Sequence, residues 1–288
     1  MRISEILKEK KTFSFEVFPP KNDKPMEPLL ETLDELSKFN PDFISVTYGA
    51  GGTNKGRNNE VCKEILSRGI TMMSHFTCIG NSKEDVLARV NRFIGMGGEN
   101  LLALRGDLPE GWECTGGDYK HGDALIEALI KSFPQLCVAG ACYPEKHIES
   151  SSFDDDIKYM KYKQDNGAQF FVSQLCYNTE AFERFLIRCE KAGITVPIIV
   201  GLMPVLFKNG LIRMTTTNGC FIPSDLAKII EKYGDDKEEF KKAGKEYTKE
   251  LMYRYTKIGI DGLHIYSLNK YKDLSEIIIE SGIRDMFK

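Results

Sequence analysis

The sequence predicts an α/β fold, a single (β/α)8 or TIM barrel that fills residues 1–288 as one domain. Three observations favour this fold. The chain has 288 residues, and a barrel of this kind needs about 250. Eight short apolar runs alternate with amphipathic stretches, which is typical of a parallel sheet covered by helices. The chain also lacks the glycine-rich signature that usually marks a nucleotide site in an open sheet.

The eight apolar runs have the length and content of buried strands. Many are uninterrupted, as expected for a sheet that is covered on both faces. They begin at intervals of roughly thirty residues up to the seventh, and the last interval is longer. In order, the predicted strands span residues 12–18, 43–47, 71–76, 100–104, 137–141, 169–173, 197–202 and 263–266.

Amphipathic segments between these runs predict helices. Ser82 and Asp85 form the pattern of a capping box before an apolar stripe. Thr179 precedes a second stripe with a period of 3.6 residues. The long interval before the last strand holds two helical patterns, one from Ser224 and one over residues 236–257. No serine- or proline-rich linker divides the chain, so a single domain is expected.

The main competitor of the barrel is an open, doubly wound sheet. Such a sheet usually carries G-x-G-x-x-G or G-x-x-x-x-G-K-[ST] at its nucleotide site. Segments 49–52 (GAGG) and 95–98 (GMGG) satisfy neither pattern. If the protein binds a dinucleotide, we therefore expect a different kind of site.

Composition argues for a small-molecule partner. The 39 Lys and Arg residues against 42 Asp and Glu residues give a net charge of -3, with no basic run to bind nucleic acid or an anionic membrane. The first residues are too charged for a signal peptide, and the longest apolar stretch, 197–207, is too short to span a bilayer. We therefore expect a cytoplasmic protein.

Cysteine and histidine spacing predicts neither disulfides nor a metal. The eight cysteines are scattered without C-x-x-C, and a chain of this length does not need disulfide bonds. The four histidines show no H-x-x-x-H or H-E-x-x-H spacing. We expect reduced thiols and no metal site.

Polar side chains gather at the ends of the predicted strands, where barrels build their active sites. Alternation along strand 12–18 places Ser14 and Glu16 on the face opposite Phe13 and Phe15. If the phenylalanines face the helices, Glu16 points into the mouth of the barrel. An apolar setting disfavours a charged carboxyl, which suits a general acid. The alternative is a solvated strand end or an ion pair.

Four other positions have both a functional and a structural interpretation. Asp107 follows Gly106, which permits close approach to a ligand, but it is equally typical of an ordinary turn. Asp156 and Lys163 share one helix face and could line a groove, although such pairs are more often solvated. Gln174 could hydrogen-bond a heterocycle or simply cap a loop.

Six segments resemble the methylenetetrahydrofolate reductase family in order and approximate spacing, and the resemblance covers essentially the whole chain. They lie at successive strand ends, so together they are far more specific than any one of them. The segments are residues 15–20 (FEVFPP), 46–52 (VTYGAGG), 75–78 (HFTC), 104–107 (LRGD), 143–147 (YPEKH) and 173–174 (SQ).

The resemblance implies that residues 1–288 form one flavin-binding catalytic domain, a cytoplasmic oxidoreductase of one-carbon metabolism that serves methionine biosynthesis. It would reduce 5,10-methylenetetrahydrofolate to 5-methyltetrahydrofolate by ping-pong hydride transfer from NAD(P)H through FAD. Members hold FAD without a Rossmann domain, which explains the missing glycine signature. A homo-oligomer is implied. The alternative is a flavin and folate subunit that receives electrons from a partner protein rather than from NADH.

The resemblance also implies roles for single residues. Glu16 resembles the acid that protonates the N10 side of the folate and opens its five-membered ring. Asp107 resembles the carboxylate beside the flavin and the pterin, where a negative charge favours the cationic folate intermediate. The implied flavin-binding residues are Thr47, His75, Arg105, Gly106, Asp107, Tyr119, Tyr143, His147, Asp156 and Lys163. The implied folate-binding residues are Glu16, Gln174, Phe207 and Lys270.

Three positions depart from the family pattern. Cys176 stands where many members carry an aromatic residue, so stacking by this loop is not expected. The segment before Phe207 is one residue short, which weakens its assignment to the ring-stacking position. Lys270 replaces a common arginine, which keeps the charge but loses the bidentate fork.

Overall fold

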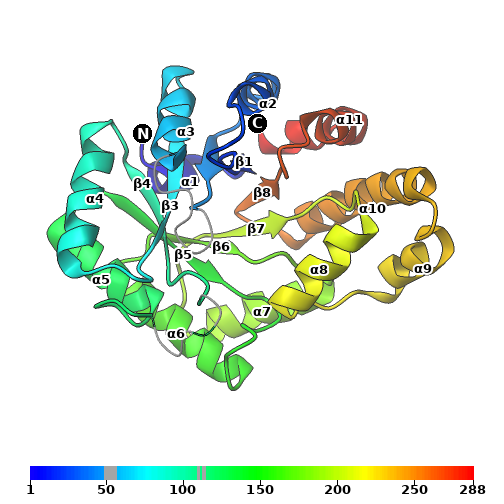
Figure 1. Ribbon diagram of the computed structural model, residues 1–288. Coiled ribbons are helices and arrows are strands. Elements are labelled where there is room, and N and C mark those ends of the chain that lie inside the picture. Colours follow the sequence, from blue (N-terminus) through cyan, green and yellow to red (C-terminus); the bar gives the residue numbers. More distant parts are fainter. Residues whose placement is uncertain (49–56, 109–110, 112–114) are drawn as a thin grey trace.

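The computed structural model describes residues 1–48, 57–108, 111 and 115–288 and confirms the predicted barrel. Eight parallel strands close in chain order, so that β1 pairs with both β2 and β8. Helices surround the strands (Figure 1). The strands are β1 (Thr12–Val17), β2 (Phe43–Val46), β3 (Met72–Thr77), β4 (Asn100–Leu104), β5 (Cys137–Cys142), β6 (Phe170–Ser173), β7 (Ile198–Leu202) and β8 (Gly262–Tyr266).

The helices follow the strands as the amphipathic pattern predicts. A short 3-10 helix, η2 (Ile283–Phe287), ends the chain. The α-helices are α1 (Ile3–Glu9), α2 (Glu27–Ser37), α3 (Arg57–Ser67), α4 (Lys83–Gly95), α5 (Gly122–Ser132), α6 (Phe153–Asp165), α7 (Thr179–Lys191), α8 (Lys208–Asn218), α9 (Ser224–Tyr233), α10 (Lys237–Ile258) and α11 (Tyr271–Ser281).

Local sequence signals place several helix starts correctly. Ser82 caps α4, its hydroxyl accepting from Asp85 N at 3.1 Å, and the Asp85 carboxylate accepts in return from the Ser82 backbone. Asn178, one residue before the predicted start, caps α7. Asp236 caps α10, so the long interval before β8 holds the two predicted helices.

Alternation along the strands divides the core into two layers, because successive side chains point to opposite faces. Phe13 and Phe15 are fully buried in the outer layer, where they join helix residues such as Leu33. The expectation that Glu16 faces inward is therefore confirmed. The inner layer, inside the barrel, consists of Ile3, Phe43, Met73, Leu102, Cys137, Ala139, Phe170, Val172 and Ile199.

The charged start of the chain forms α1, which closes the amino-terminal end of the barrel. Ile3 is fully buried in the inner layer, and its N–H donates to Asn100 Oδ1 at 2.7 Å. Asn100 Nδ2 donates in turn to the carbonyls of Met1 and Met72, both at 3.1 Å. Side chains therefore fill this end of the barrel, opposite to the carboxyl ends of the strands.

Within the described residues, no helix is long and apolar enough to cross a membrane. The seven cysteines in this part of the chain are all free, and six of them are buried. Burial raises the pKa of the Cys62 thiol to about 12 and also raises that of Cys142. These thiols therefore pack as small apolar groups and are not activated nucleophiles.

Candidate active site

The polar strand ends meet in one cavity at the carboxyl ends of the strands. This cavity has a volume of about 820 Å³. A second cavity of about 410 Å³ lies beside β4, β5, α5 and α6. Six residues line both cavities, so the two form one elongated cleft. They are Leu104, Arg105, Ala141, Tyr143, His147 and Glu149.

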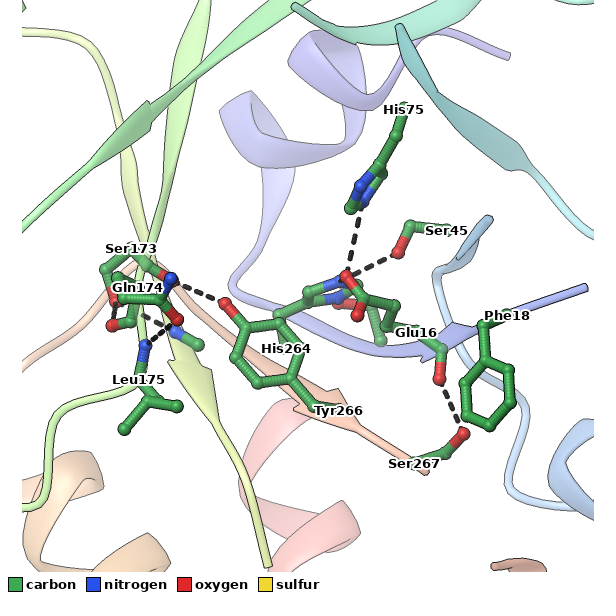
Figure 2. Close-up of polar contacts among 12 residues, drawn as sticks. Glu16, Phe18, Ser45, His75, Ser173, Gln174, Leu175, His264, Tyr266 and Ser267 are labelled. Atoms are coloured by element: carbon green, nitrogen blue, oxygen red, sulfur yellow. Dashed lines mark hydrogen bonds and ion pairs between the residues drawn. The ribbon is translucent and has the colours of Figure 1, made fainter. Parts of the chain in front are cut away.

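Glu16 is the carboxylate that β1 sends into the first cavity. In the sheet it pairs with Ser45 of β2 and Tyr266 of β8, and its side chain is 19% exposed. Its backbone oxygen accepts from Ser267 N at 3.1 Å and from Ser267 Oγ at 2.5 Å, the latter drawn in Figure 2. The main chain at Glu16 is therefore held between β2 and β8, which fixes the position of the Cα atom from which the side chain extends.

Two imidazoles flank this carboxylate. Nε2 of His75 lies 3.2 Å from Oε2 of Glu16 (Figure 2), and Nε2 of His264 lies 3.9 Å from the same oxygen. His75 Nε2 is buried but is not aligned for a hydrogen bond. Among the described residues, no donor is aligned with the Glu16 carboxylate either. Both groups therefore keep hydrogen-bonding capacity for a bound ligand.

His264 lies in the core of the barrel beside Glu16 and does not line either cavity. It is fully buried, with Nδ1 at 2.8 Å from Ser14 Oγ and Nε2 at 2.9 Å from Ser45 Oγ. Its ring stacks on Phe43 at a centroid distance of 5.3 Å. Burial lowers the pKa of His264 to about 4, so it is neutral at pH 7. A neutral imidazole offers one donor and one acceptor, which the two serines match.

The turn after β4 brings Asp107 to the cavity. Gly106 has φ +89°, and a Cβ there would lie 2.8 Å from Ile79 Cγ2, so the turn requires glycine. Asp107 lines the cavity and is exposed. Arg105 forms a bidentate ion pair with Glu149, with Nη2 at 2.8 Å from Oε1 and a second contact from Nη1 to Oε2. The guanidinium thus has a carboxylate partner inside the cleft.

The second cavity contains the predicted helix pair of α6. Asp156 Oδ2 accepts from His147 N at 2.9 Å, and Lys163 Nζ donates to Ala141 O at 2.8 Å. Burial raises the pKa of Asp156 and lowers that of Lys163. The Tyr143 ring packs edge-on against His147 at a centroid distance of 4.6 Å. Asp156 and Lys163 thus line one groove and do not form the solvated helix face that is the commoner case.

The structure brings most of the predicted site residues together. Asp156 and Lys163 line the second cavity. The first cavity is lined by Glu16, Thr47, His75, Arg105, Gly106, Asp107, Tyr143, His147 and Gln174. Positions 49–52 of the GAGG segment lie outside the described residues.

Three predicted residues do not line either cavity. Tyr119 is only 6% exposed and packs in the outer core, where its carbonyl accepts from Thr115 Oγ1 at 3.0 Å. Phe207 precedes α8 and is 46% exposed. Lys270 precedes α11, with its Nζ 5.9 Å from the centre of the Phe207 ring. Phe207 and Lys270 thus meet each other outside the cavity lining.

Sequence reasoning missed three residues that lie in the cleft or contact its residues. His264 carried a usable signal, because it stands two residues before Tyr266 on one strand and so shares its inward face. Glu149 and Asn218 had no usable signal in the sequence, since their partners Arg105 and Gln174 are each 44 residues away along the chain.

The described residues hold no group of three or more His, Cys, Asp or Glu side chains that could bind a metal ion. The cleft offers an inward carboxylate, the imidazoles of His75 and His147, an exposed carboxylate, an amide and a half-buried ammonium group. Such a set can move protons and hold a polar, flat ligand.

Known proteins are similar to this chain over nearly its whole length. The family model for methylenetetrahydrofolate reductase matches residues 2–282. The 5,10-methylenetetrahydrofolate reductase of Escherichia coli is 31% identical over 272 residues, which cover 94% of this chain and 90% of the relative. Methylenetetrahydrofolate reductase (NADH) 1 of Arabidopsis thaliana is 32% identical over 290 residues and 96% of this chain, but the chain spans only 49% of that relative.

A solved structure supports the fold alone. An uncharacterized protein from Clostridium thermocellum, described as binding two copies of 5-methyl-5,6,7,8-tetrahydrofolic acid, superposes with a TM-score of 0.66 at 16% identity. The alignment covers 99% of each chain. The sequence matches carry the family assignment, because they extend over nearly the whole chain at more than 30% identity. The chain belongs to the methylenetetrahydrofolate reductase family.

Proposed function

We propose that this chain reduces 5,10-methylenetetrahydrofolate to 5-methyltetrahydrofolate, with FAD as the hydride carrier and NAD(P)H as the electron source. Family membership supports the reaction class. The observation that carries the proposal is the Glu16 carboxylate, which lies in the cavity at the strand ends with two imidazoles beside it. A proton donor in this position is what opening of the folate ring requires.

The second cavity fits the phosphate-bearing part of a flavin dinucleotide. The half-buried Lys163 donates to the carbonyl of Ala141 and forms no ion pair within the described residues. Desolvation lowers the pKa of this ammonium group, so an anionic ligand beside it would stabilise its charged form. Asp156, on the same helix face, is suited to a ribose hydroxyl. When bound, the flavin would supply the hydride that reduces the folate.

The residues of the first cavity would carry the acid chemistry. Glu16 donates a proton to N10 of the folate, which breaks the N10–methylene bond and leaves a cation at N5. The exposed carboxylate of Asp107 favours this cation electrostatically. Gln174 hydrogen-bonds the pterin. Thr47, His75, Arg105, Gly106, Tyr143 and His147 line the space beside these groups and would hold the flavin.

Substituting Glu16→Gln separates the two half-reactions. The amide cannot donate this proton, and general acid catalysis contributes about 10²–10⁴-fold. We expect anaerobic stopped-flow traces in which NADH reduces the flavin of the variant at the wild-type rate. Reoxidation by methylenetetrahydrofolate should slow by that factor. Glu127→Gln, a surface change on α5, should leave both steps unchanged.

A folded, flavin-loaded Glu16→Gln protein that keeps the folate step, or loses both steps, would contradict this role. A wild-type chain whose flavin NADH cannot reduce, but whose chemically reduced flavin is reoxidised by the folate, would instead indicate a subunit fed by a partner protein.

A further inference from the structure

A chain of hydrogen bonds with backbone groups at both ends runs along one wall of the first cavity. Leu175 N donates to Gln174 Oε1 at 2.8 Å, and Gln174 Nε2 donates to Asn218 Oδ1 at 2.9 Å. Asn218 Nδ2 donates in turn to Met214 O at 2.8 Å. Figure 2 shows the first of these contacts. A backbone N–H can only donate and a backbone carbonyl can only accept, so the direction of the whole chain is fixed.

Both ends of this series of hydrogen bonds lie on backbone whose position is fixed by other contacts. The loop after Gln174 is tied down by Tyr255 Oη, which donates to Cys176 O at 2.7 Å. Asn218 is the last residue of α8, which ends at Gly219 in the left-handed region with φ +65°. The orientation of the Gln174 amide is therefore set by Leu175 and Asn218 before any ligand arrives, although Asn218 itself also lines the cavity.

This arrangement leaves Gln174 with a defined remaining capacity. A glutamine amide has two N–H donors and an oxygen with two lone pairs. Leu175 uses one lone pair and Asn218 uses one N–H. One donor and one acceptor remain, on a side chain that lines the cavity. Such a pair matches the lactam edge of a pterin, which carries an acceptor oxygen next to an N–H.

We propose that Asn218 is a positioning residue, which holds the Gln174 amide in the one orientation that offers this donor and acceptor to the pterin. The proposal rests on the proposed function. Without the Asn218 oxygen, the amide can rotate about its last torsion, and its half-buried N–H loses a partner. The effect of Asn218 on folate binding then passes entirely through Gln174.

The affinity for 5-methyltetrahydrofolate, measured by titration of the flavin-loaded protein, tests the positioning role of Asn218. Asn218→Leu removes both polar atoms at nearly constant size and should weaken binding about 5–10-fold. Asn218→Asp keeps the acceptor for Gln174 and should stay within about threefold of wild type. Thr216→Leu, an exposed change on the same turn that does not line the cavity, should have no effect. Asn218→Ala replaces the leucine variant if that protein does not fold.

The double variant distinguishes positioning from direct contact. Gln174→Ala alone should weaken folate binding, and adding Asn218→Leu should weaken it no further. If the two effects multiply, or if Asn218→Leu binds like wild type while wild type binds the folate, the positioning role is wrong and the proposed function stands. If wild type itself does not bind the folate, the proposed function fails and this inference falls with it.

Discussion

Burial of His264 predicts a measurable pH dependence of stability. In the unfolded chain this histidine takes up a proton near pH 6.5, whereas in the folded protein burial lowers its pKa to about 4. Between these values the unfolded state binds more protons, so the free energy of unfolding falls as the pH falls. Above pH 6.5 the full contribution of His264 to the free energy of unfolding is present. The whole shift corresponds to about 3 kcal/mol.

Urea unfolding at pH 7 and pH 5 measures this contribution. Over that interval His264 should account for about 2 kcal/mol of the loss in unfolding free energy. The variant His264→Asn removes the titrating group. Between pH 7 and pH 5 its free energy of unfolding should therefore fall by about 2 kcal/mol less than that of wild type. Its absolute stability will also differ, but only the pH dependence matters here.

His121→Asn is the matched control, because His121 is exposed at the start of α5 and its loss should leave the pH dependence of wild type unchanged. If His264→Asn and wild type lose the same free energy between pH 7 and pH 5, the imidazole is not held neutral by burial, and the account of the core beside Glu16 is wrong.

Two further substitutions test the turn after β4 and the second cavity. Gly106→Ala should lower the free energy of unfolding by about 3–5 kcal/mol, because φ is +89° and the new Cβ meets Ile79. Gly69→Ala, at φ +71° with nothing within 4 Å, should cost only about 1–2 kcal/mol in the same urea titration; equal losses would contradict the steric argument. Lys163→Met should weaken FAD binding at least tenfold but leave riboflavin binding unchanged, as measured by ultrafiltration. Lys161→Met, two residues earlier on α6 and in an ion pair with Asp165, does not line the second cavity and should bind FAD like wild type; an equal loss in both variants would remove the assigned role of Lys163.

Strand positions were predictable because a buried parallel strand leaves a continuous apolar run. The fourth predicted strand, 100–104, matches β4, and the first ends one residue later than β1. Helix starts followed from capping residues such as Ser82 and Asp236, whose side chains accept from backbone N–H groups close by in the chain. Both signals are local, so a single sequence contains them.

The site was predictable only where alternation or turn chemistry fixes a direction. Glu16 faces inward because β1 alternates, and Gly106 is required by a positive φ. Lys270 and Phe207 precede helices that lie outside the barrel, so no strand period fixes where their side chains point. Tyr119 follows a loop whose path no local pattern determines, which explains why its ring packs in the core instead of lining the cleft.

The pairs that organise the cleft are the least predictable features. Arg105 with Glu149, and Gln174 with Asn218, join side chains from different βα units. Their meeting depends on closure of the barrel and on the length of the loops, and neither property is encoded in a short window of sequence.

An anaerobic visible spectrum of the purified chain, recorded before and after NADH and again after methylenetetrahydrofolate, tests the proposed reductase activity most directly. We expect flavin bands that bleach with NADH and return with the folate. A colourless protein that cannot take up FAD, or a reduced flavin that the folate does not reoxidise, would contradict the proposed activity.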